Sequence, residues 1–222
     1  GLGDVYKRQL LFCSDAKAKE LKFIKVTNNL NHPWGMSFID QNNLLITERG
    51  GRLLRVHLPS QNIFPVSHDL KILALRQGGL LDVLYHKEYV YLSYSEDRGS
   101  GKSSTSVVRG KIINDVLMNT KTLFRAEPPI NSGFHFGSRL VIQDSFLFIS
   151  AGERHEGMIA QDGSKHPGSI IRINLDGSTP STNPHFVNKK DWAPEVYQIG
   201  VRNPQGIALS PFDHKVYMVN HG

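Results

Sequence analysis

The run from Val201 to Gly206 combines a cation, an amide and a turn within six residues, in the order Val, Arg, Asn, Pro, Gln, Gly. Arg202 offers a planar fork of donors that stays charged, and Asn203 beside it offers both a donor and an acceptor. Pro204 and the closing glycine favour a rigid bend. The run predicts a corner that binds an anionic, carbonyl-rich ligand. The alternative is an ordinary polar loop.

A histidine stands earlier in the chain at the start of another apolar run. His135 is flanked by Phe134 and Phe136. An imidazole held among aromatic rings near a strand start can act as a general base near neutral pH. The alternative is a histidine that packs its ring into a hydrophobic rim. Gln77 occupies the equivalent point before a further apolar run, which begins at Gly78.

The elements that would position these residues follow a pattern that recurs four times. A glycine opens an alternating apolar segment, a turn and a second apolar segment follow, and a polar or acidic loop closes the unit. The copies begin at Trp34, Gly78, Phe136 and Gln205. In three copies a further, nearly alternating strand follows, from Arg52, Thr105 and Gly168. Each unit therefore predicts a small antiparallel sheet.

The spacing of the units indicates the architecture. The opening glycines lie 44, 58 and 69 residues apart, close to one four-stranded blade plus loops of growing length. The sequence therefore predicts an all-β fold, a β-propeller represented by about four blades. The alternative, a two-sheet sandwich, does not predict the same register four times. We expect Arg139 to tie neighbouring blades together, and the loops at 154–167 and 176–194 to cap one face.

Blade entrances surround the axis of a propeller, where pockets form. Gln77, His135 and Arg202 occupy matching positions at the entrances of successive units. We therefore expect these three side chains to converge on one pocket. His155 and His166, with the glutamates near them, match no zinc-binding pattern.

The composition limits the possible partners. Lys and Arg total 26 against 20 Asp and Glu, a formal net charge of +6 in 222 residues. The basic residues are dispersed, so nucleic-acid binding is not expected. No apolar run approaches about 18 residues, so no membrane span is expected. With Cys13 as its single cysteine, the chain can form no internal disulfide.

The first 20 residues are expected to lie outside the folded domain. Residues 1–9 resemble an adapter-derived extension, and residues 10–18 resemble the end of a signal peptide. This interpretation favours export to the periplasm or secretion, and the alternative is a disordered leader. Residues 21–222 then form a partial propeller domain. Because the last unit stops at Gly222, directly after its second strand, the sequence predicts a truncated ring.

A set of motifs in fixed order carries a family resemblance. They are HPWGMSF, LLITERGGRL, QGGLLDV, YLSYSE, HFGSRL, GSIIRINLDGS and VRNPQG. From about Leu21 to Gly222 the chain resembles the PQQ-dependent soluble sugar dehydrogenases, the glucose/sorbosone dehydrogenase family. The resemblance implies a six-bladed propeller, of which this chain is similar to the N-terminal part. It also implies pyrroloquinoline quinone (PQQ) and calcium as cofactors, and oxidation of aldoses at C1 to lactones.

The resemblance also implies roles for individual residues. His135 would be the general base that removes the proton of the sugar's C1 hydroxyl while hydride moves to the quinone, and Arg202 would polarise the accepting carbonyl. Asn203 and Gln77 match positions that hydrogen-bond the cofactor. Gly222 matches the start of a stretch whose backbone carbonyls bind calcium. Further basic residues of the family's carboxylate clamp fall after Gly222, so we expect this chain alone to be inactive.

Two departures from the family pattern bear on the site. Val201 stands where family members often have His, and the loop GERHEG at 152–157 leaves the role of Arg154 open. The predicted partners are an aldose substrate and an external electron acceptor, with no signal for a particular sugar or oligomeric state. The alternative is a non-catalytic propeller that binds carbohydrate or protein. A calcium-dependent hydrolase would need acidic ligands at the blade entrances, which carry Gln, His and Arg instead.

Overall fold

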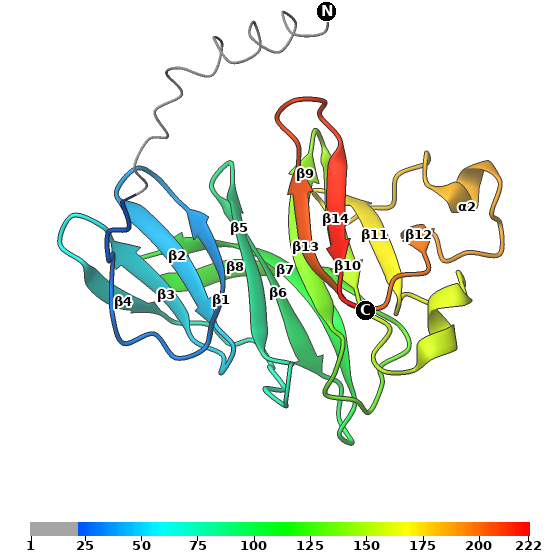
Figure 1. Cartoon of the computed structure of the whole chain (residues 1–222), viewed down its shortest axis with the longest axis horizontal. Helices are drawn as coiled ribbons and strands as arrows, with labels where there is room; N and C mark the ends of the chain where they lie inside the picture. Colours follow the sequence, from blue (N-terminus) through cyan, green and yellow to red (C-terminus); the bar gives the residue numbers. More distant parts are fainter. Residues whose placement is uncertain (1–21) are drawn as a thin grey trace, which may run out of the picture.

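The computed structural model describes residues 22–222, so the predictions for residues 1–20 lie outside the described residues. In this part of the chain the helical segments are the 3-10 turn η1 (Gly157–Gln161) and the short helix α2 (Pro184–Val187), and every other regular element is a strand (Figure 1). No helix in residues 22–222 is long and apolar enough to cross a membrane. The predicted all-β fold class is confirmed.

The strands form three four-stranded sheets and one two-stranded sheet, each antiparallel with its strands in chain order (Figure 1). The first sheet contains β1 (Pro33–Phe38), β2 (Asn43–Glu48), β3 (Leu53–His57) and β4 (Asn62–Val66). The second contains β5 (Leu80–His86), β6 (Tyr89–Asp97), β7 (Ser103–Ile113) and β8 (Val116–Arg125). The third contains β9 (Gly137–Gln143), β10 (Phe146–Ala151), β11 (Ser169–Asn174) and β12 (Val196–Ile199). The last contains β13 (Pro204–Leu209) and β14 (Val216–Asn220).

The four predicted strand pairs are the first two strands of the four sheets. The first strands also contact one another in succession, β1 with β5, β5 with β9, and β9 with β13. This is the arrangement of propeller blades, in which the first strand of each blade lies nearest the axis. The fold is therefore part of a β-propeller, and the two-sheet sandwich is wrong.

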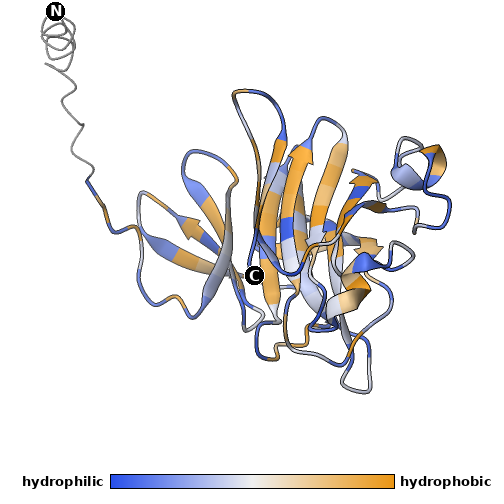
Figure 2. Ribbon diagram, turned by 45° about the vertical axis from the view of Figure 1, so that its right-hand side comes forward, coloured by the Kyte–Doolittle hydropathy of each residue, from blue (hydrophilic) through white to orange (hydrophobic). Residues whose placement is uncertain are grey.

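Apolar side chains fill the spaces between adjacent sheets. Leu45, Leu80 and Leu92 are buried between the first and second sheets. Val107 and Ile149 are buried between the second and third. In Figure 2 hydrophobic residues run along the strands, while hydrophilic residues occupy many of the connecting loops. Removal of this apolar surface from water holds the blades face to face.

Arg139 of β9 ties four innermost strands together, as expected. Its guanidinium contacts the carboxylate of Asp82 on β5 at 3.3 Å, the carbonyl of Gln205 on β13 at 2.9 Å and the carbonyl of Trp34 on β1 at 3.4 Å. It also lies over the Trp34 ring, 3.8 Å from the centroid. The other oxygen of Asp82 accepts the backbone NH of Leu140 at 2.9 Å. The starts of four blades therefore have a fixed relative position.

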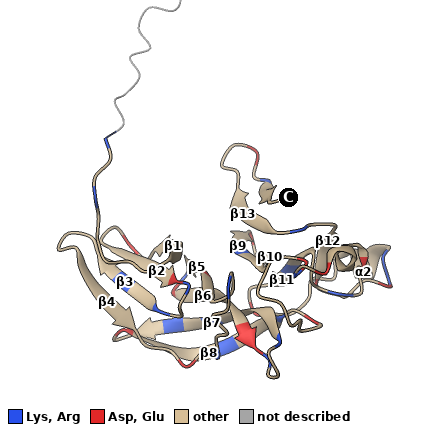
Figure 3. Ribbon diagram, turned by 60° about the horizontal axis from the view of Figure 1, so that its bottom comes forward, with Lys and Arg blue, Asp and Glu red and all other residues tan. Residues whose placement is uncertain are grey.

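Charged residues are mixed along the strands, with acidic positions among the basic ones (Figure 3). Arg55 of β3 donates to both carboxylate oxygens of Asp115, at 2.6 and 2.7 Å. Arg125 of β8 donates to Glu96 of β6 at 2.7 Å. Many positive charges on the sheets are thus neutralised by a neighbouring strand or loop.

The two long loops leave opposite ends of β11 but meet where the NH of Ala193 donates to the carbonyl of Gly163 at 2.8 Å, so their capping of one face stays a prediction. The loop at 154–167 connects β10 to β11, whereas the loop at 176–194 leaves the far end of β11 and carries α2 beside β12 (Figure 1). Successive connections in an antiparallel sheet alternate between its two ends. The first loop therefore lies at the end where the blades begin, and the second starts from the opposite end.

Gly79 shows why a glycine opens the second blade. Its φ is +155°, and a Cβ at this position would lie 1.8 Å from the carbonyl oxygen of Arg49 in the first blade. That carbonyl accepts the backbone NH of Leu80 at 3.2 Å. Only a residue without a side chain allows the two backbones to approach so closely.

We expect Gly79→Ala to lower the free energy of unfolding by about 3 kcal/mol or more, because the methyl group forces the first and second blades apart. Gly99→Ala is the matched control. Gly99 also has a positive φ, +77°, but a Cβ there would meet nothing within 4 Å. Its backbone strain alone should cost about 1–2 kcal/mol. Chemical denaturation measures both changes, and equal losses would contradict the role of the blade contact.

Candidate active site

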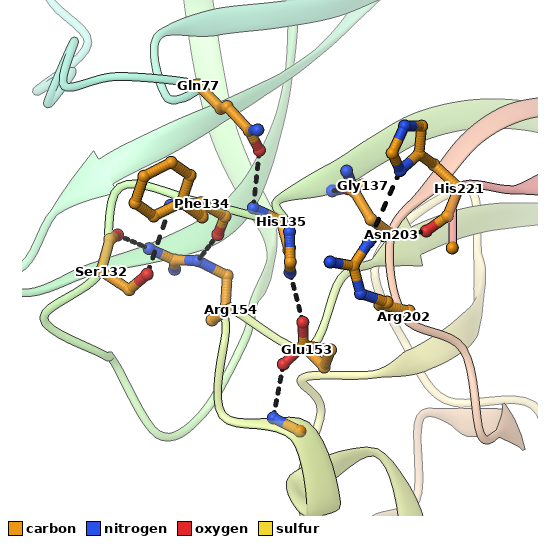
Figure 4. Close-up of polar contacts among 12 residues, drawn as sticks. Gln77, Ser132, Phe134, His135, Gly137, Glu153, Arg154, Arg202, Asn203 and His221 are labelled. Atoms are coloured by element: carbon orange, nitrogen blue, oxygen red, sulfur yellow. Dashed lines mark hydrogen bonds and ion pairs between the residues drawn. The ribbon is translucent and has the colours of Figure 1, made fainter.

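A cavity of about 300 Å³ lies at the end of the sheets where the blades begin. It brings together Gln77, His135, Arg202 and Asn203, four of the five residues predicted for the site. The remaining lining residues are Trp34, Arg49, Leu81, Phe136, Gly137, Gln205 and His221. Gly222, the fifth predicted residue, does not line this cavity. Figure 4 shows the polar contacts around Gln77, His135 and Arg202.

The propeller positions these residues by a common rule. Gln77 precedes β5, His135 precedes β9, and Arg202 and Asn203 precede β13. Each of them therefore lies at the entrance of a blade. Arg139 links the first strands of these blades to one another. The predicted convergence of Gln77, His135 and Arg202 on one pocket is confirmed.

His135 is buried and held by its ring and by its backbone. Its Nδ1 hydrogen-bonds Oε1 of Glu153, and the second oxygen of Glu153 accepts the backbone NH of Gly157 at 2.6 Å (Figure 4). The carboxylate favours the tautomer that carries its proton on Nδ1. Nε2 then carries a lone pair at the cavity. This arrangement suits a general base whose orientation is fixed from behind.

Glu153 was not predicted as a functional residue. Burial by itself raises the pKa of this carboxyl, but the hydrogen bonds from His135 and from the Gly157 backbone outweigh burial and hold the pKa below its usual range. The carboxylate is therefore ionised at neutral pH. Its signal in the sequence is its place two residues after the end of β10, the strand that pairs with β9, because the end of one strand lies beside the start of its antiparallel partner.

The amides of Gln77 and Asn203 hold the backbone around His135. The side-chain oxygen of Gln77 accepts the NH of His135 at 2.8 Å (Figure 4). The side-chain oxygen of Asn203 accepts the NH of Gly137 at 3.2 Å and the side-chain amide of Gln205 at 2.8 Å. Both oxygens are thus engaged with protein. The NH₂ groups of Gln77 and Asn203 remain as donors for a ligand, because neither has a hydrogen-bond partner within residues 22–222.

Arg202 is exposed at the cavity. Its Nη1 donates to the carbonyl of His221 at 3.1 Å, and no carboxylate in the described part of the chain pairs with it. Asn220 accepts the backbone NH of Arg202 at 3.2 Å and that of Asn203 at 3.0 Å. The contact with His221 therefore holds the guanidinium beside the end of β14, and its other NH groups remain as donors for an anion.

Gly222 adjoins Arg202, and its carbonyl accepts the side-chain amide of Asn220 at 3.2 Å. Calcium takes six to eight oxygen ligands, and a single carbonyl supplies one of them. Residues 22–222 contain no group of three acidic, histidine or cysteine side chains that could hold a metal ion. The assignment of Gly222 to calcium stays a prediction, and no chemical step is derived through that ion.

Arg154, whose role the sequence left open, supports the wall behind His135. It is buried, and it donates to the carbonyls of Ser103 at 2.8 Å, Phe134 at 3.0 Å and Ser132 (Figure 4). Its guanidinium lies 3.6 Å from the centroid of the Phe136 ring. Burial lowers the pKa of Arg154 to about 10, so the side chain remains charged at neutral pH. Its donors are directed at protein, not at the cavity.

His155 and His166 both make contacts with protein groups. His166 accepts the backbone NH of Glu127 at 2.8 Å through Nδ1, and its Nε2 lies 3.4 Å from Glu195. His155 packs its ring against that of His135, with centroids 5.4 Å apart.

The cavity thus presents guanidinium and amide donors beside an oriented imidazole, and no acidic side chain lines it. Comparison with known proteins places this arrangement in a family. The family model described as "Glucose / Sorbosone dehydrogenase" matches residues 30–222. Aldose sugar dehydrogenase YliI of Escherichia coli strain K12 is 36% identical over 204 residues, which cover 88% of this chain and 55% of that protein.

A second relative and a solved structure are also glucose dehydrogenases by name. Quinoprotein glucose dehydrogenase B of Acinetobacter calcoaceticus is 29% identical over 233 residues, covering 88% of this chain and 48% of that protein. A crystal structure of a glucose dehydrogenase superposes with a TM-score of 0.85 at 36% identity and covers 90% of this chain and 60% of that one. The chain spans about half the length of these curated relatives. On this match and this fold, the chain belongs to the glucose/sorbosone dehydrogenase family.

Proposed function

We propose that the protein containing this chain oxidises aldose sugars at C1 to lactones with PQQ as cofactor. The observation that carries the proposal is the imidazole of His135, which is hydrogen-bonded to Glu153 and lines the same cavity as Arg202 and Asn203. The names of the two curated relatives, an aldose sugar dehydrogenase and a quinoprotein glucose dehydrogenase, support both the substrate class and the quinone. A module that only binds carbohydrate or protein needs no base oriented in this way.

The donors of the cavity fit PQQ, a planar quinone with three carboxylates. Arg202 supplies a cation without a carboxylate partner in the described residues, and the NH₂ groups of Gln77 and Asn203 supply donors for carbonyl or carboxylate oxygens. Trp34 and Phe136 add aromatic surface to the lining. These residues would hold the cofactor, which when bound accepts a hydride.

The chain's own residues would carry the proton. Nε2 of His135 takes the proton of the sugar's C1 hydroxyl as C1 becomes a carbonyl carbon, which turns the ring into an imidazolium. Glu153 stabilises that charge through Nδ1 and keeps the ring in place. Arg202 would stabilise negative charge that develops on the accepting side. An external electron acceptor would complete the cycle.

The proposal extends to the location of the protein. The signal-peptide-like residues at 10–18 favour export to the periplasm or secretion.

Calcium would act beside PQQ, with the Gly222 carbonyl as one of its ligands.

The decisive experiment uses the complete gene product that contains residues 21–222. It is incubated with PQQ and calcium and assayed for dye reduction with several aldoses. We expect reduction that depends on both sugar and PQQ. If the protein neither reduces the dye nor binds PQQ, the proposed enzyme is contradicted and a binding module is favoured.

We expect loss of the base to separate binding from turnover. His135→Ala should keep PQQ affinity and lower kcat by about 10²- to 10⁴-fold, the usual contribution of a general base. His135→Asn controls for the backbone, because His135 has a φ of +50° that Asn adopts more easily than Ala. Arg202→Ala should weaken both PQQ binding and turnover. Dialysis against PQQ and steady-state assays measure the two effects, and an equal loss of PQQ affinity in both variants would contradict the assigned roles.

Glu153 should also leave a signature in the pH dependence of stability. Its pKa is lowered on folding, so its contribution is present above the unfolded value of about 4.3 and is lost as the pH falls through the folded value. We expect Glu153→Gln to cost about 1–3 kcal/mol of unfolding free energy at neutral pH, and progressively less as the pH falls below about 4. Denaturant titrations over this pH range measure the difference.

The control is Glu156→Gln, three residues away. Glu156 is exposed, and its carboxylate has no hydrogen bond or ion pair within residues 22–222. This variant should be nearly neutral at every pH. A cost of Glu153→Gln that did not change between neutral and acidic pH would rule out the ionised pair as its source.

A further inference from the structure

A second arginine lines the cavity and was not predicted from the sequence. Arg49 follows β2 directly, in the first blade. Its backbone is fixed on both sides, since its NH donates to the carbonyl of His32 at 3.0 Å and its carbonyl accepts the NH of Leu80 at 3.2 Å. Its side chain is half-buried. The position of this cation is therefore set by the contact between the first two blades.

The guanidinium of Arg49 has no carboxylate partner and no hydrogen-bonded one within the described range 22–222. The acid next to it in the chain, Glu48, is engaged elsewhere. One oxygen of Glu48 accepts the NH of Asn31 at 2.6 Å, and the other accepts Nε of Arg52 at 2.5 Å. Arg55, Arg98, Arg125 and Arg139, by contrast, each pair with a carboxylate. Arg49 resembles Arg202 in this respect.

The two arginines that line the cavity come from different blades. Arg49 comes from the end of β2 in the first sheet, and Arg202 from the entrance of β13 in the last sheet (Figure 1). No Asp or Glu lines the cavity between them. Glu153, the acid that the site uses, does not line the cavity and is hydrogen-bonded to His135. A partly buried cation without a counter-ion is costly, and an anionic ligand that binds it offsets that cost.

A neutral sugar would satisfy neither cation. A ligand with anionic groups at two separated points would satisfy both, and a planar quinone with several carboxylates has that form. We propose that Arg49 binds a carboxylate of the cofactor, from a different blade than Arg202. Arg49 is then a cofactor-binding residue contributed by the first blade. The inference rests on the proposed function, because PQQ is the ligand in question.

The test is PQQ affinity, measured by equilibrium dialysis of the complete gene product against PQQ without any sugar. We expect Arg49→Gln to raise Kd by about ten- to a hundredfold, the effect of removing a charged hydrogen-bond partner. Arg49→Lys should raise Kd less, because it keeps the charge but not the planar fork. Added salt should weaken binding to the wild type more than binding to Arg49→Gln.

Arg76→Gln is the matched control. It makes the same change of charge near the same blade entrances, but Arg76 lies over the Phe134 ring and lines a different cavity. Its Kd should stay within about twofold of the wild type, well under the tenfold that corresponds to 1.4 kcal/mol.

Equal Kd values for Arg49→Gln and Arg76→Gln would overturn the inference while leaving the proposed function intact. Failure of the wild type to bind PQQ would overturn both. If Arg49→Gln does not fold, as judged by thermal melting, an unchanged Kd in Arg49→Lys would overturn the inference.

Discussion

The contact between Asp82 and Arg139 is the constraint on which the rest of the structure depends. It lies where four innermost strands meet, and it fixes β5 to β9 by a charge pair while the same guanidinium holds β1 and β13 by their carbonyls. Burial raises the pKa of Asp82, an effect that Arg139 and the backbone NH groups of Leu140 and Val83 partly offset. A buried carboxylate with this many directed partners allows few alternative arrangements of the strands. Gly35 contributes to the same contact, because a Cβ there would lie 2.7 Å from the Asp82 carboxylate.

The cavity follows from this constraint. When the first strands are fixed side by side, the residues that precede them and those that follow the second strands are brought to one end of the sheets. Gln77 and Asn203 then serve both the fold and the site. Their oxygens accept the NH groups of His135 and Gly137 and so determine how β9 begins, while their NH₂ groups remain available to a ligand. Because one face of each amide is occupied by protein, the direction of its donors is set before any ligand arrives, which lowers the entropy lost on binding.

The residues at strand starts could be predicted from the sequence, and those at strand ends could not. The repeated glycines marked each blade entrance, so Gln77, His135 and Arg202 could be aligned without a structure. Arg49 and Glu153 follow the second strands of their blades, and the repeat indicated only that a polar or acidic loop closes each unit. Which way such a side chain turns depends on strand register, and the pairings of β1 with β2 and of β9 with β10 both contain a register shift near these ends. A shift of one residue exchanges the two faces of a strand, and periodicity alone does not reveal it. Loop length and composition likewise carry no information about which end of a sheet a connection leaves.

The backbone at His135 is strained and is held by its surroundings. His135 and Arg154 both adopt left-handed conformations, with φ of +50° and +60°, and the NH of Arg154 donates to the carbonyl of His135 at 3.3 Å. Each such residue costs free energy relative to a glycine in the same place. The surrounding residues stabilise this conformation. Gln77 accepts the NH of His135, and Glu153 hydrogen-bonds its ring. Gly152 leaves room for the His135 carbonyl oxygen, which would lie 2.1 Å from a Cβ at position 152. A histidine that only filled a hydrophobic rim would need none of these contacts. Their combined effect is to fix the imidazole at the cavity, which is the property that the proposed proton transfer would require.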